Sequence, residues 1–312
     1  MDTLKEIKIL ASKISELRQS IYIDSIKHHL ERAEYYYQHG ENDPDYYNDV
    51  IYRTNQAFEG AIKEAYKILA SKDDTIVVKE TVYSIEQYFD ENKIFKDRIL
   101  ELFRNYRSDW RNASTHDYKL FFDSSEAYIA LTSVSSFVFL LLKQIMEKIS
   151  ADLELHNINT SKARQKRITS LINAQTDLLE LISAILIEFI HVHNLSSEVK
   201  LHKPELMGLL SGYLSAFYNI SVHIQPSLVS GLKPDFLITL NHDRVIVIIK
   251  RYLFIKDIEP AISELLTYMT QSGIEQGVLL AIAEKVDNDR KQTEDRIFDI
   301  EENTLKIRII KN

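Results

Sequence analysis

The sequence predicts an all-helical N-terminal half followed by a C-terminal half of mixed α/β structure. As far as about residue 150, hydrophobic residues recur every three or four positions, which is the spacing of one face of an α-helix. Beyond residue 220 the apolar residues form short, β-branched runs bounded by Gly, Pro, Asn and Asp, as strands do. Only 7 Gly and 5 Pro occur in 312 residues, which favours helix over turn-rich β architecture.

Six helices are expected in the first half, and each carries an apolar stripe at helical spacing. Gly40 is a typical helix C-terminus, and the following ENDPDYY breaks the periodic pattern before the longest early helix begins. SKDD at 71–74 indicates a turn. The expected helices cover 3–18, 22–40, 45–70, 80–90, 93–112 and 124–149.

The second half follows a segment, 151–166, that loses helical periodicity and gains polar residues, so a linker is expected there. Helices are then expected over 168–195, 203–218 and 257–273. The expected strands are SVHIQPSLV, DFLITL, RVIVIIKRYLFI, GVLLAIAE and LKIRII, in that order along the chain. The predicted domains are therefore residues 1–150 and 167–312.

The composition excludes several kinds of chemistry. The chain has no cysteine, which excludes thiolate metal sites, cysteine nucleophiles and disulfides. The N-terminal residues carry charges throughout and do not form the apolar core of a signal peptide. The apolar run FVFLLL at 137–142 is far too short to span a bilayer, so we expect a cytoplasmic protein with no membrane partner. A net charge of −8 argues against a generally nucleic-acid-coated surface but allows a local basic cleft.

The stretch RNASTH at 111–116 places Arg111 and His116 with four residues between them. On a continuous helix, at ~100° per residue, the two side chains would point about 140° apart. They can converge only if the chain leaves the helix between them. Asn112, Ser114 and Thr115 favour such a departure because their side chains bond to their own backbone.

A cationic stripe leads to this stretch. Arg104, Arg107 and Arg111 stand at i, i+3 and i+7, on one face of the expected helix, and Asp109 is the only acidic residue between 104 and 111. We expect Arg104 and Arg107 to bind phosphate groups of RNA.

An Arg–His pair without a carboxylate partner suits RNA cleavage. RNA carries its own nucleophile, the 2′-hydroxyl. Histidine can transfer protons to and from the reacting oxygens, and arginine can stabilise the charge that develops on the phosphate. No metal and no other cofactor are needed for this chemistry.

The pattern resembles the nuclease motif of HEPN domains, which are helical bundles that carry Arg, four to six residues, then His, usually with a polar residue after the Arg. Arg111, Asn112 and His116 match it, and the resemblance covers roughly residues 20 to 150. It implies a metal-independent endoribonuclease that acts as a homodimer, with the motifs of two subunits in one cleft. Some HEPN toxins continue with any residue and a Tyr that a partner nucleotidyltransferase modifies; Tyr118 matches that regulatory position.

The second half is similar to the restriction-endonuclease-like core, whose signature is Pro-Asp, a spacer, then Asp or Glu, any residue and Lys. Asp235 matches the first acid and Lys250 matches the lysine. The middle acid should stand at 248, where this chain has Ile248. Because a hard cation such as Mg²⁺ needs carboxylate oxygens, this domain is expected to be catalytically degenerate unless Glu205 supplies a replacement.

Three functions remain open on these residues. The first is a metal-independent endoribonuclease, and the pairing of the two families implies a toxin or phage-defence effector with a cognate antitoxin. Its C-terminal domain would then bind DNA or a nucleotide partner, or serve in dimerisation. The second is a metal-dependent DNA endonuclease that uses Asp235 and Lys250. The third is a non-catalytic protein that binds nucleic acid.

Overall fold

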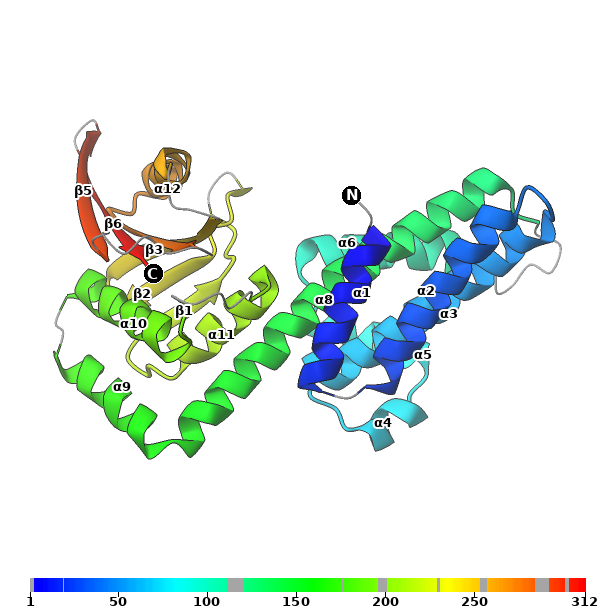
Figure 1. Cartoon of the computed structure of the whole chain (residues 1–312), viewed down its shortest axis with the longest axis horizontal. Helices are drawn as coiled ribbons and strands as arrows, with labels where there is room; N and C mark the ends of the chain where they lie inside the picture. Colours follow the sequence, from blue (N-terminus) through cyan, green and yellow to red (C-terminus); the bar gives the residue numbers. More distant parts are fainter. Residues whose placement is uncertain are drawn as a thin grey trace. The chain divides into compact units, whose positions relative to one another are not determined.

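The computed structural model describes residues 3–18, 20–111, 121–174, 177–195, 201–228, 231–252, 257–283, 292–300 and 303–312. The chain divides into two compact units, Met1–Ile149 and Ser150–Asn312. In the described ranges, every regular element before residue 150 is helical and every strand lies after residue 220 (Figure 1). The predicted order of an all-helical half and then a mixed α/β half is confirmed.

The first unit is a bundle of helices. Its elements are α1 (Thr3–Leu17), α2 (Ile21–His39), α3 (Asp45–Leu69), α4 (Asp74–Lys79), α5 (Val82–Asn92), α6 (Asp97–Tyr106), the π-helix η1 (Arg107–Arg111) and the first part of α8 (Ser124–Thr160). Helix α4 was not predicted: its first turn is capped by the Asp73 side chain, which accepts the backbone N–H groups of Thr75 and Ile76. The predicted helix 93–112 begins later, at Asp97, because Lys93 takes a left-handed φ of 50° at the end of α5.

Helices α2 and α3 form an antiparallel pair that lies side by side in Figure 1. Near the turn between them, the rings of Tyr36 and Tyr46 are 5.3 Å apart. Farther from the turn, His29 of α2 meets Arg53 of α3 at 3.3 Å. Because earlier α2 residues meet later α3 residues, the two helices must run in opposite directions.

Gly40 ends α2, as the sequence predicts. Its backbone is right-handed, with φ −65°, so conformational freedom is not the reason for glycine here. A Cβ at this position would lie 2.2 Å from the Tyr47 ring. The close approach of that ring is what requires a glycine.

An aromatic cluster forms the centre of the helical core. Phe58 of α3 is fully buried, and its ring centroid lies 4.7 Å from Tyr106, 5.1 Å from Phe137 and 5.7 Å from Phe103. These side chains come from α3, α6 and α8, three segments far apart in the sequence. The cluster therefore fixes α6, and with it the start of η1, against α3 and α8.

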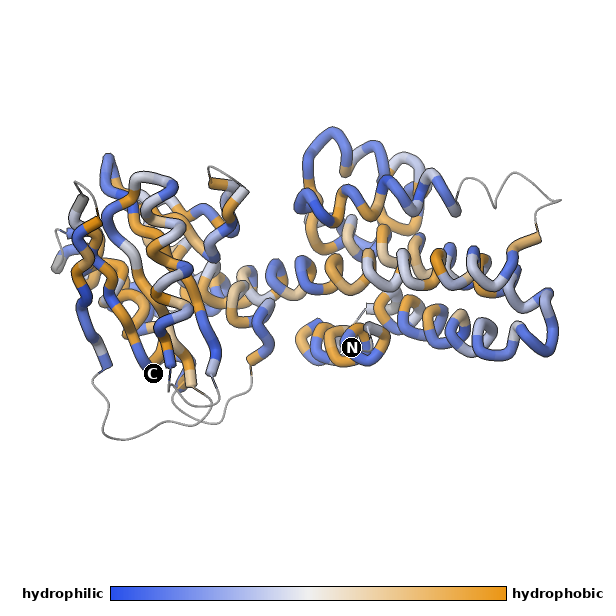
Figure 2. Tube along the Cα trace, turned by 90° about the horizontal axis from the view of Figure 1, so that it is seen from above, coloured by the Kyte–Doolittle hydropathy of each residue, from blue (hydrophilic) through white to orange (hydrophobic). Residues whose placement is uncertain are grey.

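The second unit contains the end of α8, four further helices and a six-stranded sheet. Its elements are α9 (Lys162–Ala174), α10 (Leu178–Val192), α11 (Lys203–Ser215), β1 (Ser221–Ile224), β2 (Phe236–Leu240), β3 (Asp243–Tyr252), α12 (Glu259–Ser272), β4 (Gln276–Ala283), β5 (Thr293–Ile300) and β6 (Asn303–Lys311). Strands β1, β2 and β3 are antiparallel neighbours, whereas β3, β4 and β6 run parallel, in the order β1-β2-β3-β4-β6-β5. Figure 2 shows the hydrophobic residues of this unit gathered in the central strands.

The sheet is covered on both faces, which explains why β3 and β4 are apolar almost throughout. Val245, Val247 and Ile249 of β3 pack in the core with α10 and α11. Ile246 and Ile248 point to the other face and pack in the core with α12. Alternation along β3 therefore places Lys250 on the α12 side of the sheet.

The predicted linker at 151–166 is wrong. Helix α8 continues to Thr160 and α9 begins at Lys162. This segment has no Gly or Pro to end a helix. Its buried residues Glu154 and Ile158 have helical spacing, but only Ile158 is apolar, so no apolar stripe marks the helix. The single helix expected over 168–195 is instead two, because Asp177 caps the start of α10 by accepting the Glu180 N–H.

One strand, β5, was not predicted. Its sequence, TEDRIFDI, has three consecutive charged residues and an adjacent apolar pair, and it pairs with β6 alone, at the edge of the sheet. Charged side chains are typical of edge strands, where they prevent pairing with other chains. Such a strand lacks the apolar run by which the other strands were recognised.

Within the described residues, α8 contains an 18-residue window that is long and apolar enough to cross a membrane. More than half of that window, 56%, is buried inside the protein. A helix that is surrounded by its neighbours in a protein core is apolar on most sides, so the composition of α8 does not by itself indicate a membrane span.

Candidate functional site

The structure describes the approach to the RNASTH stretch as far as Arg111. Helix α6 changes to a π-helix over Arg107–Arg111. The backbone of Arg111 is described but its side chain is not, and Asn112, His116 and Tyr118 lie outside the described residues. The convergence of Arg111 and His116 therefore stays a prediction.

Two side chains hold the π-helix in place, one directly before it and one within it. Before it, Tyr106 is almost fully buried, and its phenol donates a 2.9 Å hydrogen bond to Asn55 Oδ1 on α3. Burial raises the pKa of Tyr106, so its hydroxyl stays protonated and remains a donor. Within it, Trp110 packs on Phe122, with the ring centroids 6.3 Å apart. The chain is thus held to the bundle where its helical geometry changes.

A π turn closes hydrogen bonds from i to i+5 rather than i to i+4, so it changes the angular spacing of side chains. The stripe of Arg104, Arg107 and Arg111 was expected on a continuous α-helix, whereas the backbone over Arg107–Arg111 is a π-helix. π-Helical segments are rare and occur often at functional sites. Regular α-helix thus ends at Tyr106, and the first residue of the motif, Arg111, is the last residue of the π-helix.

Arg104 and Arg107 are paired with acids of α5. Arg104 lies 3.1 Å from Asp90, and Arg107 lies 3.7 Å from both Glu86 and Asp90. Arg107 also stacks over the Phe103 ring at 5.4 Å. Arg104 is the more accessible of the two, with 55% of its side chain exposed. The sequence did not reveal these α5 partners, which partly neutralise the cationic stripe.

In the second unit, Asp235 and Lys250 lie at the same end of two adjacent strands, β2 and β3. Asp235 precedes β2 and accepts the Ile249 N–H of β3 at 2.7 Å. Its other carboxylate oxygen lies 3.4 Å from Lys203 Nζ of α11. Glu205 accepts the backbone N–H of His202 and so caps α11. Nothing in these contacts directs Glu205 toward Lys250.

Ile248 is buried in the apolar core against α12, so the position of the absent acid is filled by packing. Lys250 bonds instead to Glu264 of α12 at 2.6 Å, and the Tyr268 hydroxyl donates to the same carboxylate at 3.1 Å. Burial, with the charge of Glu264, raises the pKa of Tyr268 to about 12.

Over the described ranges, no group of three or more His, Asp or Glu side chains could hold a metal ion. Glu264 was not predicted as a site residue, although its i, i+4 spacing with Tyr268 is visible in the sequence.

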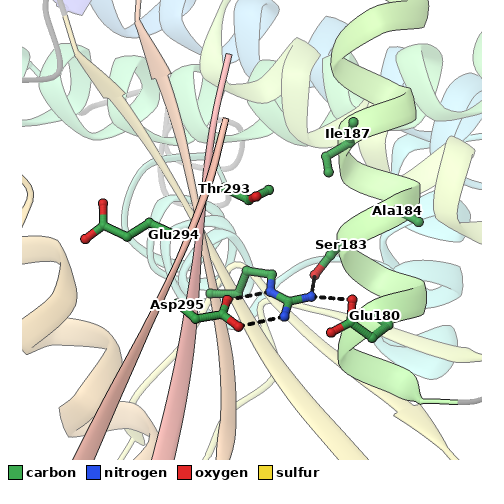
Figure 3. Close-up of a pocket in the computed structure, with 8 residues that line it drawn as sticks. Glu180, Ser183, Ala184, Ile187, Thr293, Glu294 and Asp295 are labelled. Atoms are coloured by element: carbon green, nitrogen blue, oxygen red, sulfur yellow. Dashed lines mark hydrogen bonds and ion pairs between the residues drawn. The ribbon is translucent and has the colours of Figure 1, made fainter. Parts of the chain in front are cut away.

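A polar cavity of about 370 Å³ lies between α10 and the β5–β6 edge of the sheet (Figure 3). Arg308 of β6 lines it and is only 9% exposed. Its guanidinium forms a bidentate pair with Asp295, at 2.6 and 2.8 Å, and bonds to Glu180 at 2.6 Å and Ser183 at 3.2 Å. These contacts lower the pKa values of Asp295 and Glu180. Because two carboxylates already hold Arg308, the cavity is a poor site for an anion.

A second hollow, of about 660 Å³, lies in the helical unit beside Ser20, Tyr22 and Lys67. Behind it, Glu64 is fully buried and accepts a hydrogen bond from the Ser20 hydroxyl. Burial raises the pKa of the Glu64 carboxyl. Lys67 is paired at 2.6 Å with Asp74. Asp24 and Asp74 line the hollow together with Lys67, so it carries both signs of charge and is not built to bind an anion.

Comparison of the chain with protein-family models, with curated proteins and with solved structures gave no match. The function is therefore inferred from the residues and their geometry.

The Arg308 network gives a prediction about stability. Arg308→Met removes the cation that binds both carboxylates and leaves only Lys306, 3.3 Å from Asp295. We expect the unfolding free energy at pH 7 to fall by about 1–2 kcal/mol, a value reduced for the partial exposure of both acids. Lowered carboxyl pKa values stabilise the fold above the unfolded values, 3.8 for Asp and 4.5 for Glu, and this stabilisation is lost as pH falls through the folded values. Urea unfolding from pH 7 to pH 3 should show the difference from wild type shrinking below about pH 4.5.

The matched control is Arg296→Met, which removes an arginine that also pairs with two acids, Glu259 and Glu294. The Arg296 side chain is 29% exposed, against 11% for Arg308. Arg296→Met should change stability much less than Arg308→Met. A difference for Arg308→Met that is the same at every pH would show that the ion pairs are not its source.

Proposed function

We propose that the protein is a metal-independent endoribonuclease of HEPN type, with Arg111, Asn112 and His116 as its catalytic residues. The observation that carries this proposal is the change from α- to π-helix over Arg107–Arg111, directly before the motif. Arg111 and His116 need a departure from α-helical geometry between them in order to converge, and the proposal takes support from the end of the α-helix at Tyr106, before the motif begins. The helical bundle around them, with α6 and α8 on either side of the motif, agrees with the resemblance.

In the proposed reaction the 2′-hydroxyl of the RNA attacks the adjacent phosphorus. His116 removes the proton from this hydroxyl or protonates the leaving 5′-oxygen. Arg111 holds the non-bridging phosphate oxygens and stabilises the charge that accumulates on them. Asn112 donates a hydrogen bond to the same phosphate, and the exposed Arg104 contacts a neighbouring one. Arg107 contributes less, since Glu86 and Asp90 already flank it.

One arginine and one histidine are few groups for two proton transfers and charge stabilisation. Two copies related by a two-fold axis would supply a base, an acid and two guanidinium groups in one cleft. The active form is therefore proposed to be a homodimer. Facing arginines repel one another, so apolar contacts elsewhere in the bundle must hold the two subunits together.

The C-terminal unit is proposed to be a restriction-endonuclease-like domain without nuclease activity. The order α11, three antiparallel strands β1–β3, α12 and the parallel strand β4 supports this resemblance. Buried Ile248 and the Lys250–Glu264 pair support the loss of activity. Its role is then to bind DNA or a nucleotide partner. We further propose that the protein is a cytoplasmic toxin or phage-defence effector. It would be controlled by a cognate antitoxin and by modification of Tyr118.

The alternative enzyme is a metal-dependent DNA endonuclease that uses Asp235 and Lys250. The adjacency of Asp235 to β3, through its bond with the Ile249 N–H, favours this alternative. Against it, Glu205 caps α11 and Lys250 is bound to Glu264. A non-catalytic nucleic-acid-binding protein is the third function that these residues allow.

Substitution of the motif tests the catalytic assignment. His116→Ala and Arg111→Ala should each reduce RNA cleavage by ~10²–10⁴-fold, because a positioned acid–base or charge-stabilising group is removed. Cleavage of labelled RNA is measured by gel electrophoresis, and circular dichroism checks that the helical fold persists. Lys250→Ala is the matched control and should cleave RNA at the wild-type rate. Near wild-type cleavage by either motif variant would exclude the assignment.

The assembly is tested by sedimentation velocity of the full chain over a range of concentrations. We expect a dimer at the concentrations at which RNA is cleaved, with activity falling as dilution produces monomer. A monomer that keeps full activity per chain would contradict the two-subunit cleft.

A further inference from the structure

One face of α2 consists of His, Arg and Tyr. Between Ser25 and His39, at ~100° per residue, seven positions fall within about 120° of one another around the helix axis. They are Ser25, His28, His29, Arg32, Tyr35, Tyr36 and His39. The neighbouring acids Glu31 and Glu34 project elsewhere around the helix, and Glu31 pairs with Lys8 of α1 at 3.3 Å. In a chain of net charge −8, a helix face without any acid is unusual.

The side chains of this face stack on one another at the surface. The Arg32 guanidinium lies over the rings of Tyr35, at 4.6 Å, and Tyr36, at 4.8 Å, and donates a 3.1 Å hydrogen bond to the Tyr36 hydroxyl. The Tyr35 and His39 rings are stacked, with centroids 4.2 Å apart. Tyr35 is 43% exposed, so its ring is not used to fill the core.

Helix α3 extends the same surface. Arg53 meets His29 at 3.3 Å and lies over the Tyr52 ring at 5.6 Å. Tyr52 is 57% exposed. Asp49 is the acid nearest to Arg32 and Tyr36 on this helix. We call Arg32, Tyr35, Tyr36, His39, Tyr52 and Arg53 the aromatic–arginine surface.

This surface leads toward the π-helix. Around the axis of α3, Tyr52 lies between two groups of side chains. Arg53, which meets α2, is on one side of it, and Asn48 and Asn55 are on the other. Asn55 accepts the Tyr106 hydroxyl just before η1. Asn48 accepts the Phe122 N–H, on the far side of the motif, at 3.1 Å. The exposed Tyr52 is thus positioned on the α3 surface between α2 and the segments that flank RNASTH.

We propose that the aromatic–arginine surface binds single-stranded RNA and leads it to the motif at 111–116. Exposed rings such as Tyr35 and Tyr52 offer stacking platforms for unpaired bases, and Arg32 and Arg53 offer cations for the phosphates between them. Two arginines, Arg32 and Arg53, against one aspartate, Asp49, make the surface complementary to a polyanion. The same charge opposes its use as a symmetric contact between two copies of the chain. This inference rests on the proposed ribonuclease function and identifies the strand that reaches it.

Binding is tested with a fluorescent single-stranded oligodeoxynucleotide, which offers bases and phosphates but no 2′-hydroxyl to be cleaved. Fluorescence anisotropy with the full chain should show tighter binding of the single strand than of its duplex. Tyr35→Ala should weaken binding roughly five- to 150-fold, while Tyr35→Phe, which keeps the ring, should bind as wild type does. Arg32→Ala should weaken binding and lower the slope of log affinity against log salt by ~0.7 for each phosphate that the protein no longer neutralises.

Tyr83→Ala is the matched control, because Tyr83 of α5 is also an exposed tyrosine, at 61%. Unchanged binding by Tyr35→Ala and Arg32→Ala, or an equal loss in Tyr83→Ala, would overturn the proposal. So would dissociation of a dimer by these variants with strand binding intact, since the surface would then be a subunit contact. If the strand binds in a way that depends on Tyr35 but the protein cleaves no RNA, the proposed surface is supported and the ribonuclease function is rejected. If RNA is cleaved but strand binding does not depend on Tyr35, the ribonuclease function is supported and the proposed surface is rejected.

Discussion

The attachment of α6 to α3 is the constraint on which the candidate site depends. Phe58, Phe103 and Tyr106 pack together in the core, and the Tyr106 hydroxyl bonds to Asn55. An unpaired phenol at this depth would lose its hydration without compensation, so the hydrogen bond fixes both the depth and the rotation of α6. The π-helix begins at the next residue. The backbone that leads into the motif is thus attached to the bundle core up to the start of the π-helix.

The arginine and lysine side chains discussed above have different surroundings in the two units. In the helical unit, arginines lie at the surface, beside exposed rings on α2 and α3 or beside α5 acids, where a polyanion can compete for them. In the sheet unit, Arg308 is enclosed by Asp295 and Glu180, and Lys250 is held by Glu264. The latter cations are satisfied by the protein's own carboxylates. This difference favours nucleic-acid chemistry in the helical unit and a structural role for the charged pairs in the sheet unit.

The sequence predicted most of the fold, because apolar periodicity records which face of an element is buried. Helix α3 was predicted within a residue, since its stripe continues for 25 residues, and β3 and β4 were evident as apolar runs. The end of α8 and strand β5 were missed for the same reason: few of their residues enter a core, so little periodicity marks them. The pairing of Lys250 with Glu264, 14 positions away, depends on how α12 packs on the sheet, which local patterns do not specify. The α5 partners of Arg104 and Arg107 were hidden for that reason too.

Cleavage chemistry distinguishes the two units as sources of activity. The most direct measurement is mass spectrometry of the RNA fragments produced by the full chain in the presence of EDTA. Attack by the RNA's own 2′-hydroxyl predicts 2′,3′-cyclic phosphate and 5′-hydroxyl ends, an unchanged rate in EDTA, and no cut where the nucleotide at the cleavage site carries a 2′-deoxy substitution. Fragments with 5′-phosphate ends that disappear when EDTA is added would contradict this mechanism and assign the activity to Asp235 and Lys250.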